Sequence, residues 1–292
     1  MKYVGIYWTL FAPLMKKSIA KRFDRDLAQQ AIHRGKEEYR RLLSRADDLG
    51  PGNPMAMNAY FAYVFAGAWL GSGKKITPDE MALVILFRKS FRDRLVSVLG
   101  FTEAEAAQTV AIAKPKYREI IGKLPEFEKT DRFKMNIVNC AMLSAFVLSM
   151  KKKPSVEKLT DYYAKSMMTG PMRWFCRMSG KRKFSDKDVR SMKATAALNA
   201  ADRNPYSWSM EFLPYSDGSG YEARFTRCGI CTLMKELGLH DLVPAMCHLD
   251  YTMAEAGGAS DFVREYTLAS GGPYCDCGYK KKTLPSLFRA GL

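Results

Sequence analysis

The chain has 292 residues, 47% of them apolar, and a formal net charge of +16. This length allows one large domain or two smaller ones with a sizeable core, and the composition excludes disordered and fibrous proteins. No stretch reaches the roughly 18 uninterrupted apolar residues that a membrane-spanning helix needs, so we expect no membrane partner.

The positive charge is densest in three short basic runs, at residues 151–153, 181–183 and 280–282. Such a surface attracts anions, whether nucleic acid, acidic lipid or a carboxylate substrate. Short lysine runs at the ends of elements are usually solvated edges, and no recognised nucleic-acid motif accompanies them. We therefore expect a small anionic molecule as the partner rather than nucleic acid. The sequence does not determine the oligomeric state.

The amino terminus loosely resembles a signal peptide, with Lys2 before an apolar run over residues 3–15. Lys16 and Lys17 follow that run directly, where a cleavage region should be small and uncharged. We interpret the segment as an amphipathic first helix. The seven cysteines are an odd number without a small-scaffold pattern, which favours a reducing compartment and a cytoplasmic protein.

The first two-thirds of the chain predicts helices separated by glycine and proline breakers. Thr77 and Glu80 form one predicted capping box, and Thr102 and Glu105 form another. The predicted helices cover residues 22–48, 54–70, 77–99, 102–113, 131–150, 157–168 and 186–200.

After Pro205 the hydrophobic period changes toward two, which is typical of strands. An Asp-Gly-Ser-Gly turn at residues 217–220 predicts a hairpin, and Gly271-Gly272-Pro273 predicts a second one. The predicted elements are strands over 207–215 and 221–227, helices over 229–237 and 242–255, and strands over 262–269 and 274–280.

These elements predict an α+β fold in which a helical region, residues 1–203, precedes a cysteine-rich β-β-α-α-β-β region, residues 204–292. An antiparallel sheet with helices on one face is the natural architecture for that order. The two regions are also compatible with one compact domain.

Five of the seven cysteines fall in the last quarter of the chain: Cys228, Cys231, Cys247, Cys275 and Cys277. A structural zinc bound by Cys228, Cys231, Cys275 and Cys277 is one interpretation, because zinc takes four such ligands. Cys275 and Cys277 share one face of a strand and Asp276 points to the other. Burial as small apolar residues is a second interpretation, and a catalytic or substrate-contacting thiol is the third. No other cofactor is predicted.

Cys247 and Asp250 stand three residues apart on a predicted helix and therefore share a face. A carboxylate raises the pKa of a neighbouring thiol, so Asp250 alone would not activate Cys247. Asp250 could instead accept a proton or orient a water molecule, while Arg264 supplies positive potential. Asp250 could equally be an exposed helix residue without a catalytic role, and Gly271–Gly272 could simply form a turn. The three histidines do not predict a metal site.

The segment from Arg227 to Tyr279 resembles the L-2-amino-thiazoline-4-carboxylic acid hydrolase family. The matching residues are Cys228, Gly238, Leu242, Cys247, Asp250, Arg264, Thr267, Leu268, Gly271 or Gly272, Cys275 and Asp276. The chain departs from the family at Gly229, where the family has proline, and at Cys277, where it has an aromatic residue. Cys231 is additional. These departures concern the identity of the substrate.

The resemblance implies hydrolysis of a small carboxylate-bearing cyclic amidine to an N-carbamoyl cysteine. In that scheme Cys247 or Cys275 is the nucleophile, and Asp250 transfers the proton or positions water. Arg264 pairs with the substrate carboxylate as a bidentate fork. The remaining pocket residues in this scheme are Cys228 and Gly272.

Two interpretations without catalysis compete with the hydrolase. The order of strands and helices is also similar to vinyl-reductase-type small-molecule sensor domains, which need a pocket but no reactive thiol. A zinc-stabilised binding protein is the other, and the metal content of the purified protein distinguishes it.

Overall fold

The computed structural model describes residues 88–125, 127 and 131–282, together with residues 16, 25, 26, 29, 30 and 33. The chain divides into two compact units, Met1–Arg88 and Lys89–Leu292, and the sheet with the helices that surround it lies in the second. The helix predicted over 54–70 lies outside the described residues, and those predicted over 22–48 and 77–99 lie only partly within them.

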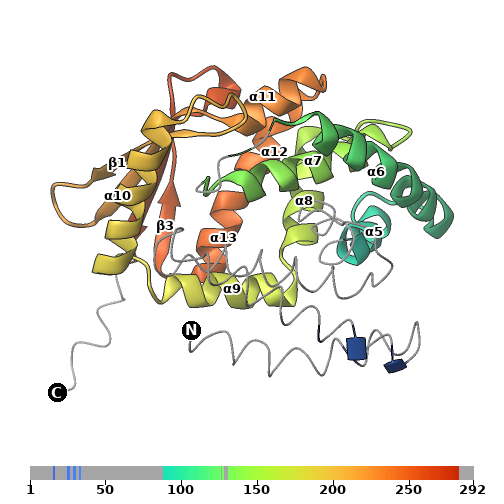
Figure 1. Cartoon of the computed structure of the whole chain (residues 1–292), viewed down its shortest axis with the longest axis horizontal. Helices are drawn as coiled ribbons and strands as arrows, with labels where there is room; N and C mark the ends of the chain where they lie inside the picture. Colours follow the sequence, from blue (N-terminus) through green and yellow to red (C-terminus); the bar gives the residue numbers. More distant parts are fainter. Residues whose placement is uncertain are drawn as a thin grey trace. The chain divides into compact units, whose positions relative to one another are not determined.

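The helical part of the second unit follows the predicted order (Figure 1). Serine and threonine side chains accept a backbone hydrogen bond at the start of several helices, and Thr102 forms the predicted capping box with Glu105. The helices are α5 (Arg88–Ser97), α6 (Glu103–Lys123), α7 (Lys134–Leu148), α8 (Val156–Met167), α9 (Gly170–Gly180) and α10 (Asp186–Ala201).

Two helices differ from the prediction. Helix α6 continues ten residues past the predicted end at residue 113 and contains Pro115. Ala113, Tyr117 and Ile120 are buried on both sides of that proline, so packing of α6 on α7 compensates for the missing backbone donor. Helix α9 was not predicted. Its signals are the Thr169 cap and a proline in the first turn.

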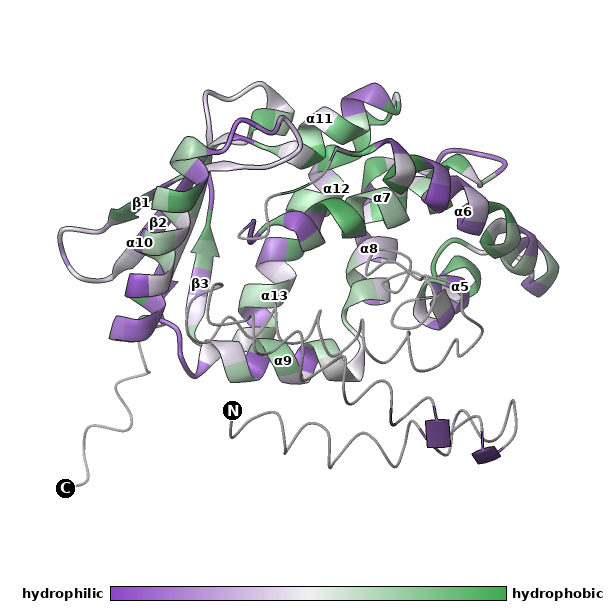
Figure 2. Cartoon of the chain, in the orientation of Figure 1, coloured by the Kyte–Doolittle hydropathy of each residue, from purple (hydrophilic) through white to green (hydrophobic). Residues whose placement is uncertain are grey.

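Helix α7 forms the centre of the helical part. Nearly every residue from 137 to 147 is buried, and α6 and α11 pack against it. Figure 2 shows α7 mostly in the hydrophobic colour. A helix that is apolar all round belongs in a core. None of the described helices combines the length and apolarity that crossing a membrane requires.

The strands form a four-stranded antiparallel sheet in the order β1-β2-β4-β3. Helices separate the two hairpin strands from the last two, which confirms the α+β class and the predicted order. The elements are β1 (Ser209–Pro214), β2 (Gly220–Arg227), α11 (Gly229–Glu236), α12 (Val243–Cys247), α13 (Leu249–Gly257), β3 (Ser260–Val263) and β4 (Cys275–Lys281), with 3-10 turns at His240–Leu242 and Leu268–Ser270.

One face of the sheet is covered by helices. Cys275 and Cys277 of β4 are buried there with Met210, Ala223 and Phe262, against residues of α10 and α13. The alternation along β4 turns Asp276 to the opposite face, as predicted. Helix α10 lies within the predicted helical region and packs on β1. The predicted domain boundary at residue 203 stays a prediction.

Two elements in the last third of the chain differ from the prediction. The strand predicted over 262–269 ends at Val263, and the following residues form a loop rather than a tight hairpin. Both oxygens of Asp276 accept backbone hydrogen bonds from this loop, which draws it away from the sheet ladder. The helix predicted over 242–255 is divided into α12 and α13 at His248.

Candidate functional site

An ion pair between Arg264 and Asp250 lies at the junction of α12 and α13. The Arg264 Nη1 atom donates to Asp250 Oδ2 at 3.1 Å, and Nη2 donates to the carbonyl oxygen of Cys247 at 2.9 Å. The side chain of Arg264 is 7% exposed, whereas that of Asp250 is 44% exposed. The guanidinium therefore holds the junction from inside, and the carboxylate keeps a surface that solvent can reach.

Opposing effects act on the Asp250 carboxyl. Burial raises its pKa, while the charges of Arg264 and Lys183 oppose that rise. The side chain is 44% exposed, so solvent reaches the carboxylate. Although burial favours its neutral form, the Asp250 and Cys247 charges raise the pKa of the Arg264 guanidinium, which stays cationic.

Cys247 lies next to this ion pair and is half-buried. Burial raises the pKa of its thiol to about 12, and Arg264 partly opposes the rise. Cys228, Asp250 and Cys275 all interact electrostatically with Cys247. Among the predicted residues, Arg264 joins Asp250 and Cys247 by direct hydrogen bonds, whereas Cys228 and Cys275 influence Cys247 only electrostatically.

The two cysteines of β4 are more deeply placed. Cys275 is 8% exposed and Cys277 is 6% exposed. The backbone N–H of Leu268 donates to Cys275 Sγ at 3.2 Å, and burial raises the pKa of both thiols. Gly272, predicted to contact the substrate, donates its N–H to the carbonyl oxygen of Thr267 at 2.9 Å and closes a turn.

Cys228 precedes α11 and interacts with the thiol of Cys231 one turn later. The hydrogen bond with Cys231 is the largest cause, and burial the next, of a Cys228 pKa that lies well above its usual range. A side chain at Gly229 would collide with the carbonyl oxygen of Tyr206. Close backbone approach therefore requires the glycine that replaces the family's proline.

The predicted four-cysteine zinc site does not form in residues 88–282, apart from the few positions that the structure leaves undescribed. No three His, Cys, Asp or Glu side chains gather there as a group that could hold a metal. Cys228 and Cys231 lie at the start of α11, while Cys275 and Cys277 lie within the sheet core.

Lys183 belongs to a basic run whose sequence pattern predicts a solvated edge, but the structure places its ammonium against aromatic rings. Its Nζ lies 3.3 Å from the ring centroid of Tyr279 and 5.1 Å from that of Tyr221. Burial lowers the pKa of Lys183 to about 8, against the opposing charges of Asp188 and Asp250. The aromatic residue after the run and the inward tyrosines of β2 and β4 were the available signals.

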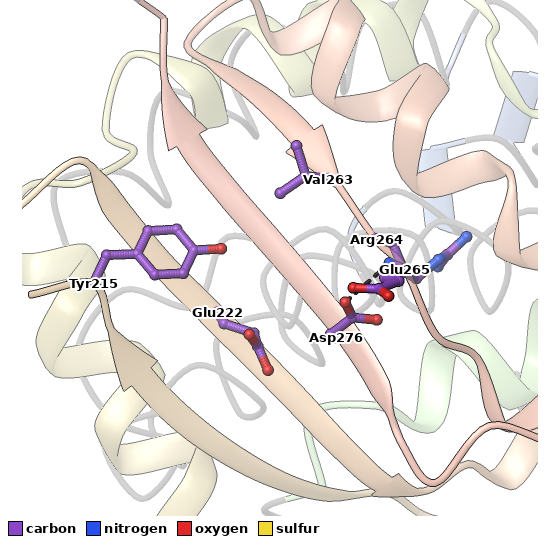
Figure 3. Close-up of a pocket in the computed structure, with 6 residues that line it drawn as sticks. All are labelled: Tyr215, Glu222, Val263, Arg264, Glu265 and Asp276. Atoms are coloured by element: carbon purple, nitrogen blue, oxygen red, sulfur yellow. Dashed lines mark hydrogen bonds between the residues drawn. The ribbon is translucent and has the colours of Figure 1, made fainter.

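A depression lies on the open face of the sheet, with a volume of about 270 Å³. Figure 3 shows Asp276 turned toward Glu265, whose N–H it binds at 2.9 Å. The other oxygen of Asp276 accepts from the N–H of Tyr266 at 2.6 Å. This carboxylate orders the loop after β3, and none of the candidate thiols lines the depression.

Residues 130–279 match the family model described as L-2-amino-thiazoline-4-carboxylic acid hydrolase. The match covers just over half of the chain and starts nearly a hundred residues before the motif at Arg227, so it includes α7 to α10 as well as the sheet. Searches of curated proteins and of solved structures found no match. The chain therefore belongs to the L-2-amino-thiazoline-4-carboxylic acid hydrolase family and is a hydrolase that acts on a small molecule.

Proposed function

We propose that the protein hydrolyses L-2-amino-thiazoline-4-carboxylic acid, or a close cyclic amidine relative, to N-carbamoyl cysteine. Family membership supports the reaction type. The observation that carries the assignment to these residues is the solvent-reached carboxylate of Asp250, held at 3.1 Å by a buried Arg264 beside Cys247.

The reaction needs attack on the ring carbon that lies between nitrogen and sulfur. In our proposal the Cys247 thiol gives its proton to Asp250 while its sulfur bonds to that carbon. The bond from the carbon to the ring sulfur then breaks, and Asp250 returns the proton to the departing sulfur. Water next attacks the same carbon. One of its protons passes through Asp250 to the departing Cys247 sulfur, and the other goes to the amidine nitrogen as the carbon–oxygen bond becomes a carbonyl. One water is consumed overall.

The electrostatics explain why Cys247 would need Asp250. With a pKa of about 12, Cys247 is a thiol at neutral pH and must lose its proton during attack. Burial raises the pKa of Asp250 and makes it a stronger base than an ordinary carboxylate. Cys275 is the less favoured nucleophile, because it is buried and its sulfur already accepts from Leu268.

The contacts of Arg264 favour a positioning role. Both terminal nitrogens are engaged, by Asp250 and by the Cys247 carbonyl, and only 7% of the side chain is exposed. Bidentate binding of the substrate carboxylate by Arg264 remains a prediction, and these contacts do not favour it. We propose that Cys228 forms a wall of the site.

Replacing Cys247 by Ala and Asp250 by Asn tests the proposal, with N-carbamoyl cysteine measured by mass spectrometry. We expect each change to lower kcat by about 1,000-fold or more, since removing a nucleophile or its base costs that much. Cys176→Ala is the control, because Cys176 is also a buried free cysteine but lies in α9.

A covalent adduct on the Cys247 peptide, trapped by rapid acid quench, would support the two-step path. Activity retained in Cys247→Ala but lost in Asp250→Asn would contradict it and favour direct attack by water with Asp250 as the base. Wild-type protein without ring-opening activity would overturn the proposed substrate.

A further inference from the structure

We propose that Lys183 is the binding residue for the substrate's carboxylate, an inference that rests on the proposed function and specifies how its site selects an acid. Neither the family motif near the carboxyl terminus nor the basic-run pattern assigns Lys183 a role.

The first observation is the aromatic cage around the Lys183 ammonium. Its Nζ lies 3.3 Å from the ring centroid of Tyr279, 5.1 Å from that of Tyr221 and 5.9 Å from that of Phe184. Tyr279 and Tyr221 face each other across β4 and β2 on the helix-covered side of the sheet. Ring faces attract a cation through the ring quadrupole and hold it in place without neutralising its charge.

The second observation is that the ammonium has donors to spare. In the part of the chain that the structure describes, Lys183 Nζ makes no hydrogen bond and no ion pair, whereas Lys153 and Lys165 are both paired with aspartates. A half-buried ammonium loses hydration that the rings only partly replace. An incoming carboxylate would supply the missing hydrogen bonds and the opposite charge.

The third observation is that the turn holding Lys183 is built under strain. Phe184 has a φ of 65°, the one positive value at a residue other than glycine among those described, in a region that side chains disfavour. One carboxylate oxygen of Asp188 accepts both from the Phe184 N–H at 2.9 Å and from the Tyr221 hydroxyl at 2.6 Å. Such bracing fixes where the preceding lysine lies.

The fourth observation is the position relative to the proposed catalytic carboxylate. Lys183 and Asp250 interact electrostatically without forming an ion pair. A continuous set of rings connects them, because Tyr279 packs on Phe262 at 5.2 Å and the Arg264 guanidinium lies 5.2 Å from the same Phe262 ring. The carboxylate and the reactive carbon of a thiazoline lie on one small ring, so a substrate that bridges Lys183 and Asp250 would present both groups.

Kinetics on two substrates test this assignment. One is 2-amino-thiazoline-4-carboxylic acid and the other is 2-aminothiazoline, which lacks the carboxylate. We expect Lys183→Met to lower kcat/KM for the acid by about 10- to 100-fold, mainly through KM, as loss of one charge-assisted hydrogen bond does. The substrate that lacks the carboxylate should show no such loss, and Lys183→Arg should restore part of the loss on the acid. Lys181→Met is the control, because Lys181 is an exposed lysine of the same run.

Equal loss on both substrates would overturn the proposal and indicate a structural role. No loss on either substrate would also overturn the proposal. Calorimetric binding of thiazolidine-4-carboxylate and thiazolidine separates this inference from the proposed function, because neither compound can be turned over as an amidine. Preference for the carboxylate that disappears in Lys183→Met would support Lys183 even if the protein opened no thiazoline. Preference that persists in Lys183→Met, or its absence in the wild type, would overturn the proposal.

Discussion

Two carboxylates on opposite faces of the same sheet show how similar groups come to differ in role. Both oxygens of Asp276 accept backbone hydrogen bonds, at 2.9 Å and 2.6 Å, on the open face. Asp250, beside the covered face, is held at one oxygen by Arg264 and is 44% exposed. A carboxylate saturated by backbone donors stabilises a loop, whereas one with a free, solvent-exposed oxygen can take up a proton.

The sharpest way to break this contrast is to remove each carboxylate in turn. We expect Asp250→Asn to lower kcat/KM by about 1,000-fold with little change in unfolding, since the amide still accepts from Arg264. Asp276→Ala leaves two backbone donors without acceptors and should lower the free energy of unfolding by about 2 kcal/mol. Steady-state kinetics and denaturant titration of both variants give the answer, and the reverse pattern would refute the assignment.

The reactivity of Cys247 tests whether its thiol is protonated at rest and therefore needs Asp250 as a base. With its pKa raised to about 12 by burial, we expect its alkylation by iodoacetamide at pH 7.5 to be about 1,000-fold slower than in the unfolded chain, where a thiol has a pKa of about 8.5. Quantification of the Cys247 peptide over time measures this. Rapid alkylation in the native state would mean that the resting sulfur is a thiolate and needs no base.

A change in helix packing tests whether the covered face depends on the approach of α9 to α13. A side chain at Gly180 would collide with the carbonyl oxygen of Gly257, immediately before the turn that holds Lys183. We expect Gly180→Ala to lower the free energy of unfolding by about 2 kcal/mol through overpacking. Gly122→Ala on α6 meets no atom within 4 Å and should stabilise by about 0.5–1 kcal/mol. Equal effects in thermal or denaturant unfolding would contradict the close contact.

The pH profile gives the smallest predicted effect. Because burial lowers the pKa of Lys183 to about 8, kcat/KM for the acid substrate should be constant just below that pH and fall about tenfold per unit above it. In Lys183→Arg the fall should move to higher pH. The titratable groups that act on or contact Lys183 are Asp188 of α10, Asp250 of α13, Tyr221 of β2 and Tyr279 of β4. Lys281 of β4 lies over the ring of the neighbouring Phe184.

Burial raises the pKa of Tyr221 and Tyr279 far enough that neither titrates in this range. A profile without a limb near pH 8, or one that Lys183→Arg leaves unchanged, would contradict a role for the Lys183 charge.

Much of the fold could be predicted because its signals are local. The Thr102–Glu105 box, the turn at residues 217–220 and the alternation of Cys275, Asp276 and Cys277 all act within a few residues. Such local signals gave the wrong ends of elements where contacts with distant residues determine the structure. Helix α6 passes Pro115 because α7 supports it, and β3 stops at Val263 because Asp276 binds the following loop.

By itself the sequence determined the α+β class, the order of the strands, the family and the spacing that places Cys247 near Asp250. Only the tertiary structure shows that Arg264 donates its hydrogen bonds to Asp250 and the Cys247 carbonyl. It also shows that Lys183 lies against Tyr279 rather than in solvent. The reason is physical: capping and periodicity depend on neighbours along the chain, whereas burial, charge pairing and pKa depend on groups that only folding brings together.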